Sequence, residues 1–302
     1  MRPLAFALAF LSCSEEPRAD DDRVPRERGG RAVETRSIRM PESAAGPERT
    51  IVMLPRARGP GDRFPLLVAL HGQGESRRGV DRGAWGWVRD YELDRADAAL
   101  RRGSLTARDF HDLVEPERLR ALNEGLRTRP YRGIVVACPY TTDLFADPEA
   151  AAQFDRFVTA ELVPRLRREL PVAQGREGTG IDGVSLGGIH ALLIGLEHPE
   201  TFGAVGGMQP AIRGRIAELV TLAGRGGDGQ ARHALGQRIR LMSSTGDRFR
   251  GLVLDLSDRL RSASVRHDVL ITPGPHDYVW NRGPGAIEML LYYDRVLRGE
   301  QD

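Results

Sequence analysis

The stretch IDGVSLGGIH, residues 181–190, decides the fold because it places one serine between glycines where two predicted elements meet. An apolar run precedes the serine and a helical pattern follows it. In a sharp strand-to-helix turn the serine backbone is strained, and the residues two before and two after it approach each other closely. Gly183 and Gly187 supply that clearance. The stretch therefore predicts that Ser185 presents its hydroxyl outside a sheet as a nucleophile.

The rest of the chain alternates between strand and helix patterns around this turn. Continuous apolar runs such as FPLLVAL predict strands covered on both faces, as in a parallel sheet. The predicted strands are 33–40, 49–54, 64–70, 133–137, 178–182, 204–208, 240–243 and 267–271, and the predicted helices are 148–170, 186–197, 252–263 and 286–297. This succession predicts an α/β fold with a doubly wound, mostly parallel sheet that begins with antiparallel strands.

Residues 75–132 form an insertion between the strand that ends in HGQG and the next buried strand. A connection of this length is unusual in a compact domain, and this one leaves from the edge where a ligand would bind. We expect a cap or pocket wall, with Trp85 as a candidate substrate contact. A surface elaboration with its own small core around the tryptophans is the alternative. Thr106 followed by Asp109 predicts a helix start within it.

The N-terminal residues have the pattern of an export signal. Residues 1–13 hold Arg2, a short apolar run and a lipobox-like end at Cys13, where lipidation would attach the protein to a membrane. Residues 14–31 predict a disordered tether, and residues 32–302 the folded domain. We expect an exported protein: a periplasmic or outer-membrane-anchored bacterial lipoprotein, or otherwise a secreted protein. A plain signal peptide is the alternative.

Composition excludes several chemistries. The 44 basic residues are all arginine, so a Schiff-base lysine, a Ser-Lys dyad and a P-loop are absent. The net charge of +2 comes from interspersed charges without basic blocks, which argues against nucleic acid as a partner. Cys138 is the one cysteine after the leader, and we expect a buried thiol there. No metal motif is present, and we expect no metal and no cofactor.

A serine nucleophile needs a base and an acid, each expected on a loop after a later strand. His276 follows the last predicted strand on a loop of prolines and glycines. His190 and His198 belong to the helix after the serine, where packing or a helix-end interaction explains them. Asp247 follows the penultimate strand and is the preferred acid, with Asp255 in the next helix as the alternative.

The negative charge on a substrate oxygen needs two backbone donors. The amide of Leu186 lies at the predicted start of the helix after Ser185. The amide of Gln73, in HGQG, is expected to face it, because the glycines let the backbone approach a substrate. We expect His71 to buttress that loop.

Three stretches resemble the putative-esterase family of α/β-hydrolases, which includes esterase D-like enzymes, feruloyl and acetylxylan esterases, siderophore esterases and mycolyltransferases. They are RTIVMLPRARGPGDRFPLLVALHGQG, FVTAELVPRLRREL and IDGVSLGGIHALLIGLEHPETFGAVGGM, within a match from about residue 49 to residue 296. The resemblance implies an α/β-hydrolase-type fold. It also implies that Ser185 is the nucleophile, His276 the base and Asp247 the acid, with oxyanion amides at Gln73 and Leu186.

Two departures bear on the substrate. Asp182 stands where the family more often has a small or apolar residue, and MQPAI at 208–212 replaces the usual serine-glycine, which makes Gln209 a candidate substrate contact. The expected activity is hydrolysis of a small-molecule or polysaccharide-linked carboxylic ester through an acyl-enzyme. The alternatives are an acyltransferase with the same triad and a catalytically inactive hydrolase-fold protein with a binding or envelope role.

Overall fold

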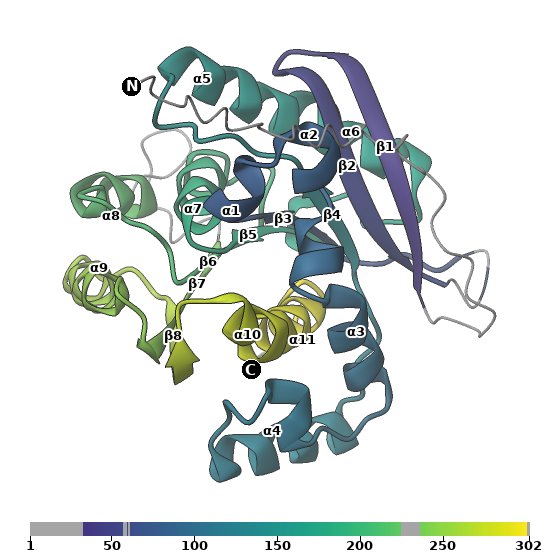
Figure 1. Cartoon of the computed structure of the whole chain (residues 1–302), viewed down its shortest axis with the longest axis vertical. Helices are drawn as coiled ribbons and strands as arrows, with labels where there is room; N and C mark the ends of the chain where they lie inside the picture. The colour runs from purple at the N-terminus through teal and green to yellow at the C-terminus, as the bar shows by residue number, and fades with distance from the viewer. Residues whose placement is uncertain (1–32, 57–58, 60, 225–235, 301–302) are drawn as a thin grey trace, which may run out of the picture. The chain divides into compact units, whose positions relative to one another are not determined.

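The structure, a computed structural model, describes residues 33–56, 59, 61–224 and 236–300 (Figure 1). Residues Ala32–Asp302 form one compact unit. The predicted leader, the predicted tether and Cys13 lie outside the described residues. Within the described ranges, no helix has the length and apolar character needed to cross a membrane.

An eight-stranded sheet forms the centre of the domain, in the order β1-β2-β4-β3-β5-β6-β7-β8. Its strands are β1 (Val33–Ser43), β2 (Gly46–Pro55), β3 (Leu66–Leu70), β4 (Val135–Pro139), β5 (Thr179–Gly183), β6 (Ala204–Met208), β7 (Arg238–Gly246) and β8 (Asp268–Pro275). β1, β2 and β4 pair antiparallel, and every pairing from β4 to β8 is parallel. The predicted mostly parallel sheet with an antiparallel start is confirmed.

Helices cover both faces of the sheet, and each face has its own apolar core (Figure 1). One face packs against α5 (Pro148–Arg156), η3 (Phe157–Leu162), α6 (Val163–Glu169), α7 (Leu186–Glu197), α8 (Ile216–Gly224) and α9 (Arg250–Ser262). The other packs against α3 (Leu93–Arg101), α4 (Pro116–Thr128) and α11 (Ala286–Val296). The remaining short helices are α1 (Gln73–Ser76), α2 (Gly79–Gly83), η1 (Gly86–Asp90), η2 (Ala107–Phe110), η4 (Arg176–Gly178), α10 (Tyr278–Trp280) and η6 (Asn281–Gly285).

The predicted helix 148–170 is continuous in the structure, although its middle, η3, winds as a π-helix. It begins where the Asp147 carboxylate accepts hydrogen bonds from the amides of Glu149 and Ala150, which caps its first turn. The structure adds α8, which is not among the predicted helices. Cys138 is buried, as expected, and burial raises the pKa of its thiol.

The insertion does not form a core of its own. Its largest buried side chains, Trp87, Tyr91 and Phe110, belong to the same apolar cluster as Ile51 and Leu67 of the sheet. Through α3 and α4 it supplies part of the helical layer on one face, beside α11 (Figure 1). The predicted capping pair is present at η2, where the Asp109 carboxylate accepts from the amide of Thr106 at 2.8 Å.

A buried ion pair crosses the sheet three residues before Ser185. Asp182 Oδ2 and Arg240 Nη1 lie 2.9 Å apart, and their side chains are 0% and 3% exposed. Burial raises the pKa of Asp182, while Arg240 opposes this shift. Gly206 of β6 makes room for the pair, because a Cβ there would lie 2.3 Å from Asp182 Oδ2 and 2.6 Å from the hydroxyl of Tyr293.

Replacement of Asp182 by asparagine keeps the side-chain shape but leaves the buried guanidinium of Arg240 without its counter-charge. We expect the free energy of unfolding, measured by urea denaturation with circular dichroism, to fall by about 3 to 5 kcal/mol. Asp258→Asn is the matched control, because its pair with Arg261 is 71% and 69% exposed. That control should change stability by less than about 0.5 kcal/mol. Equal effects of the two substitutions would contradict the prediction.

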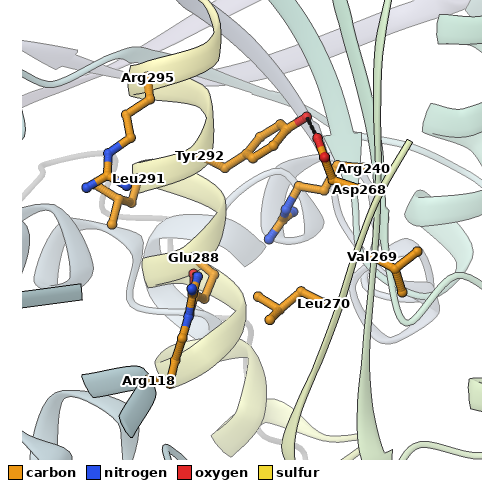
Figure 2. Close-up of a pocket in the computed structure, with 9 residues that line it drawn as sticks. All are labelled: Arg118, Arg240, Asp268, Val269, Leu270, Glu288, Leu291, Tyr292 and Arg295. Atoms are coloured by element: carbon orange, nitrogen blue, oxygen red, sulfur yellow. Dashed lines mark hydrogen bonds and ion pairs between the residues drawn. The ribbon is translucent and has the colours of Figure 1, made fainter. Parts of the chain in front are cut away.

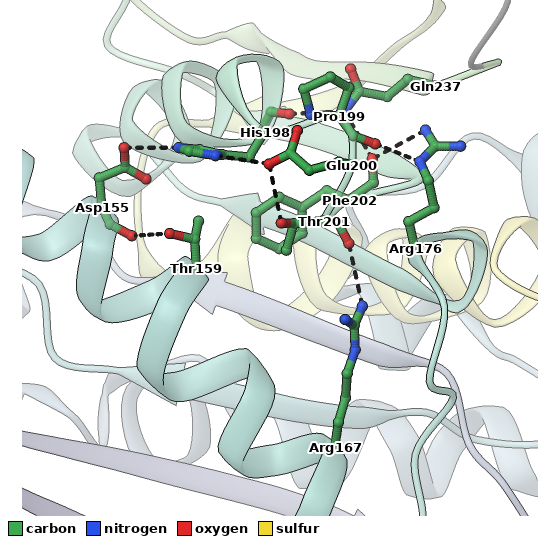
Figure 3. A network of polar contacts seen from close by, with 11 residues as sticks. Asp155, Thr159, Arg167, Arg176, His198, Pro199, Glu200, Thr201, Phe202 and Gln237 are labelled. Carbon is green, nitrogen blue, oxygen red and sulfur yellow. Dashed lines mark hydrogen bonds and ion pairs between the residues drawn. The ribbon is translucent and has the colours of Figure 1, made fainter. Parts of the chain in front are cut away.

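A second polar cluster joins the end of α7 to α5 (Figure 3). His198 lies between two carboxylates, with Nε2 2.9 Å from Asp155 Oδ2 and Nδ1 3.0 Å from Glu200 Oε1. The hydrogen bond to Asp155 is the main cause that raises the pKa of His198 to about 9. The predicted helix-end interaction of His198 is therefore present, and His190 packs in the interior.

The raised pKa makes this cluster a source of pH-dependent stability. Because the pKa of His198 is higher in the folded chain than its usual value, the stabilisation is complete below about pH 6.5 and is lost as the pH rises through about 9. We expect His198→Gln to lower the free energy of unfolding by about 1 to 2 kcal/mol at pH 6, because solvent screens the pair, and by much less at pH 10.

Urea unfolding at both pH values measures this difference. His111→Asn is the control, since His111 is exposed and has a positive φ of 51° that asparagine tolerates. A loss for His198→Gln that is the same at pH 6 and pH 10 would show that the charge of His198 contributes nothing.

Candidate active site

Ser185 occupies the strained turn between β5 and α7 that its sequence predicts. Its φ is 55° and its ψ is −113°, a conformation that side-chain-bearing residues rarely adopt. A Cβ at Gly183 would lie 2.4 Å from the carbonyl oxygen of Gly187, and a Cβ at Gly187 would lie 2.3 Å from that of Leu70. Both positions are therefore restricted to glycine, and the turn holds the serine at the carboxyl edge of the sheet.

Ser185, His276 and Asp247 meet at this edge, in the arrangement expected from the sequence. His276 Nε2 lies 3.0 Å from Ser185 Oγ, and His276 Nδ1 lies 2.7 Å from Asp247 Oδ1. His276 follows β8 directly, and Asp247 follows β7. The alternative acid, Asp255, faces solvent on α9 and pairs with Arg259 at 3.0 Å. The geometry thus favours Asp247 as the partner of the histidine.

The Asp247 carboxylate is held in its ionised form. Burial alone would raise its pKa, but hydrogen bonds from His276, from the Ser243 hydroxyl at 2.6 Å and from the Phe249 amide at 2.9 Å keep the pKa below its usual value. An ionised Asp247 accepts a hydrogen bond from Nδ1 of His276, which leaves Nε2 free to take a proton from Ser185. Ser243, four residues before Asp247, is not among the residues predicted from the sequence.

The two proposed oxyanion amides belong to the first residues of two helices. Gln73 is the first residue of α1, and Leu186 is the first residue of α7. Amides at helix starts have no acceptor within the helix, so they are available to a substrate oxygen. Gly187 brings the two segments together, because its missing Cβ allows the carbonyls of Leu70 and His71 to approach.

His71 fixes the loop that carries Gln73. Its Nε2 accepts a hydrogen bond from the amide of Thr141 at 3.1 Å, so Nδ1 carries the proton and donates to the carbonyl of Gly72 at 3.1 Å. Burial lowers the pKa of His71, which keeps the ring neutral in this role. The contacts agree with a histidine that buttresses the loop.

The two candidate substrate contacts lie inside the protein. Trp85 is 8% exposed and packs in the apolar core on the sheet face that α3, α4 and α11 cover. The guanidinium of Arg89 lies 4.3 Å from its ring centroid. Gln209 is fully buried, and its side-chain amide donates to Ser244 Oγ at 2.7 Å and to the carbonyl of Pro275 at 2.9 Å. In this structure Gln209 supports the segment that carries His276 instead of facing a substrate.

A cavity of about 290 Å³ lies away from the triad, along the first halves of β7 and β8 and against α11 (Figure 2). Charged side chains line much of it, and two of its arginines are held by neighbours: Arg118 by Glu288 at 2.6 Å and Arg240 by Asp182 at 2.9 Å. Among the described residues, no group of three His, Cys, Asp or Glu side chains could hold a metal ion.

Comparison with known proteins agrees with this architecture. The family model described as Putative esterase matches residues 141–244, which include Ser185. No curated protein matches the sequence significantly. The match to the esterase family model confirms the predicted family resemblance and, with it, the predicted class of carboxylic ester hydrolases.

Solved structures extend the likeness to most of the chain. A ferulic acid esterase is 16% identical with a TM-score of 0.64, over 88% of this chain and 100% of that chain. An S-formylglutathione hydrolase from Staphylococcus aureus is 14% identical with a TM-score of 0.60, over 88% and 98%. The enterobactin esterase from Shigella flexneri is 19% identical with a TM-score of 0.52, over 86% and 59%.

At these identities the solved structures establish a shared fold, and the family match adds the sequence pattern around the nucleophile turn. Residues 141–244 of this chain carry the pattern of the putative-esterase family, on the α/β-hydrolase fold of these esterases.

Proposed function

We propose that this chain hydrolyses carboxylic esters through an acyl-enzyme formed on Ser185. The proposal depends on the position of His276: its Nε2 lies within hydrogen-bond distance of Ser185 Oγ, and its Nδ1 within hydrogen-bond distance of Asp247 Oδ1. A serine hydroxyl becomes an effective nucleophile when an adjacent base accepts its proton and an acid fixes the orientation of that base.

The reaction follows from these positions. Ser185 Oγ attacks the ester carbonyl carbon while His276 Nε2 takes the hydroxyl proton, and the amides of Gln73 and Leu186 donate to the resulting oxyanion. When this intermediate collapses, the carbon–oxygen bond to the alcohol breaks and His276 returns the proton to the leaving alcohol. Water then attacks the acyl-enzyme with His276 as base, which releases the acid and restores Ser185.

Small-molecule esters and polysaccharide-linked esters are the proposed substrates. The solved structures with this fold include a ferulic acid esterase, an S-formylglutathione hydrolase and an enterobactin esterase, so one architecture serves different substrates. Export through residues 1–13 and lipidation of Cys13 stay predictions from the sequence.

A fluorophosphonate probe tests the nucleophile. We expect the folded protein to be labelled on one serine, and we expect labelling to disappear in Ser185→Ala, because no other serine of the described chain lies within hydrogen-bond distance of His276 Nε2. Intact-mass measurement detects the adduct, and Ser264→Ala serves as a control on a surface turn. Folded protein that remains unlabelled would overturn the proposal and favour the inactive hydrolase-fold alternative.

Hydrolysis of a short p-nitrophenyl ester tests the acid. Asp247→Asn removes the charge that orients His276 and stabilises its protonated form, and we expect kcat to fall by about 10³- to 10⁴-fold. Asp255→Asn, on the solvent face of α9, should change kcat by less than about twofold. If the second variant alone loses activity, the assignment of Asp247 is wrong.

A further inference from the structure

A buried carboxylate lies directly beside the loop that carries the Gln73 amide. Glu75, 1% exposed, is the third residue of α1 and accepts hydrogen bonds from two tyrosine hydroxyls. Tyr91 donates to Oε2 at 2.5 Å, and Tyr278 donates to Oε1 at 2.7 Å. Each carboxylate oxygen therefore has its own donor, which is the arrangement that a buried carboxylate requires.

These two tyrosines connect Glu75 to both halves of the active site. The hydroxyl of Tyr91, which donates to Glu75, accepts the backbone N–H of Gly72 at 3.1 Å, and Gly72 is the residue before Gln73. Tyr278 stands two residues after His276. A continuous series of hydrogen bonds thus joins the oxyanion loop, residues 71–76, through Tyr91 and Glu75 to Tyr278, in the segment that carries His276.

Three glycines allow the backbone to pack closely against this network. A Cβ at Gly74 would lie 2.6 Å from the Tyr278 hydroxyl, and a Cβ at Gly86 would lie 2.4 Å from Cγ of Glu75. A Cβ at Gly83 would lie 2.4 Å from the carbonyl oxygen of Glu75. Gly83, Gly86 and Tyr91 all belong to the insertion 75–132, so the first part of the insertion closes around this one carboxylate.

We propose that Glu75, through Tyr91 and Tyr278, is the positioning residue that fixes the Gln73 amide relative to Ser185 and His276. This inference rests on the proposed esterase function. It gives the start of the insertion a role in the reaction, because Glu75 and Tyr91 hold the Gln73 amide in the position from which it donates to the oxyanion. An oxyanion donor stabilises a transition state only when it is already in place, because a donor that must reorganise loses much of its effect.

The test compares Tyr91→Phe, Tyr278→Phe and Glu75→Gln with Tyr292→Phe. Tyr292 is the matched control, since its hydroxyl also lies within hydrogen-bond distance of a carboxylate, that of Asp268 at 3.1 Å, but on α11 away from the oxyanion loop. We expect kcat for a p-nitrophenyl ester to fall about 10- to 100-fold in the three network variants, less than the loss of a whole donor, while KM changes little. Tyr292→Phe should stay within about twofold of the parent enzyme.

A second readout separates positioning from a general loss of structure. A trifluoromethyl ketone that forms a tetrahedral adduct with Ser185 should bind more weakly by the same factor by which kcat/KM falls, because both depend on the oxyanion donors. Tyr278→Phe provides a variant that folds, since Tyr278 is partly exposed. Network variants with kcat/KM and ketone affinity within threefold of the parent would overturn the proposal.

Hydrogen exchange measured by mass spectrometry keeps the proposal testable apart from catalysis. We expect the amides of residues 71–76 to exchange faster in Tyr91→Phe than in the parent protein, with no change there in Tyr292→Phe. If the parent protein neither hydrolyses esters nor reacts with a fluorophosphonate, the proposed function fails, and the exchange result still decides whether Glu75 fixes the loop. Unchanged exchange in Tyr91→Phe would overturn the positioning.

Discussion

The approach of Gly187 to the carbonyl oxygens at the end of β3 is the constraint on which the site depends. It lets the first turn of α7 press against the segment that leads to Gln73. The other side of the turn is held by β6, because Ser185 donates its amide to Met208 at 2.9 Å and accepts at its carbonyl from Ala211 at 2.9 Å. These contacts on both sides offset the cost of the unfavourable φ of Ser185.

The triad uses the regular geometry of a parallel sheet. Ser185 follows β5 in the middle of the sheet, Asp247 follows β7, and His276 follows β8 at the edge. Strands that run in the same direction end at one edge, so residues far apart in sequence meet without a long loop. Gln209, after β6, fills the gap between them, since its amide binds both Ser244 beside β7 and Pro275 beside β8.

Much of this arrangement could be predicted because the signals are local. α7 and β6 have the predicted bounds, since a glycine-flanked turn and continuous apolar runs mark their ends. The order of nucleophile, acid and base also follows from positions after successive strands. α8 was not predicted, although its sequence, IAELVTLAG, is largely apolar; the helix ends where a glycine-rich stretch begins at Gly224.

Features that depend on distant partners could not be read from the sequence. Asp182 stood out as an unusual residue, but its partner Arg240 lies 58 positions away on another strand. Glu75 and Tyr278 are 203 positions apart, and their contact depends on how the insertion folds against the end of β8. Trp85 was expected near a substrate because it lies in the insertion that leaves from the ligand-binding edge, whereas in the structure it packs in the core.

The glycines of β6 have a consequence for engineering this molecule. Asp182 and Tyr293 occupy the space in front of Gly206, and Leu192 of α7 occupies the space in front of Gly207, where a Cβ would meet it at 2.9 Å. The strand beside the nucleophile therefore accepts no side chain at Gly206 or Gly207. Attempts to redesign substrate preference should therefore leave Gly206 and Gly207 unchanged.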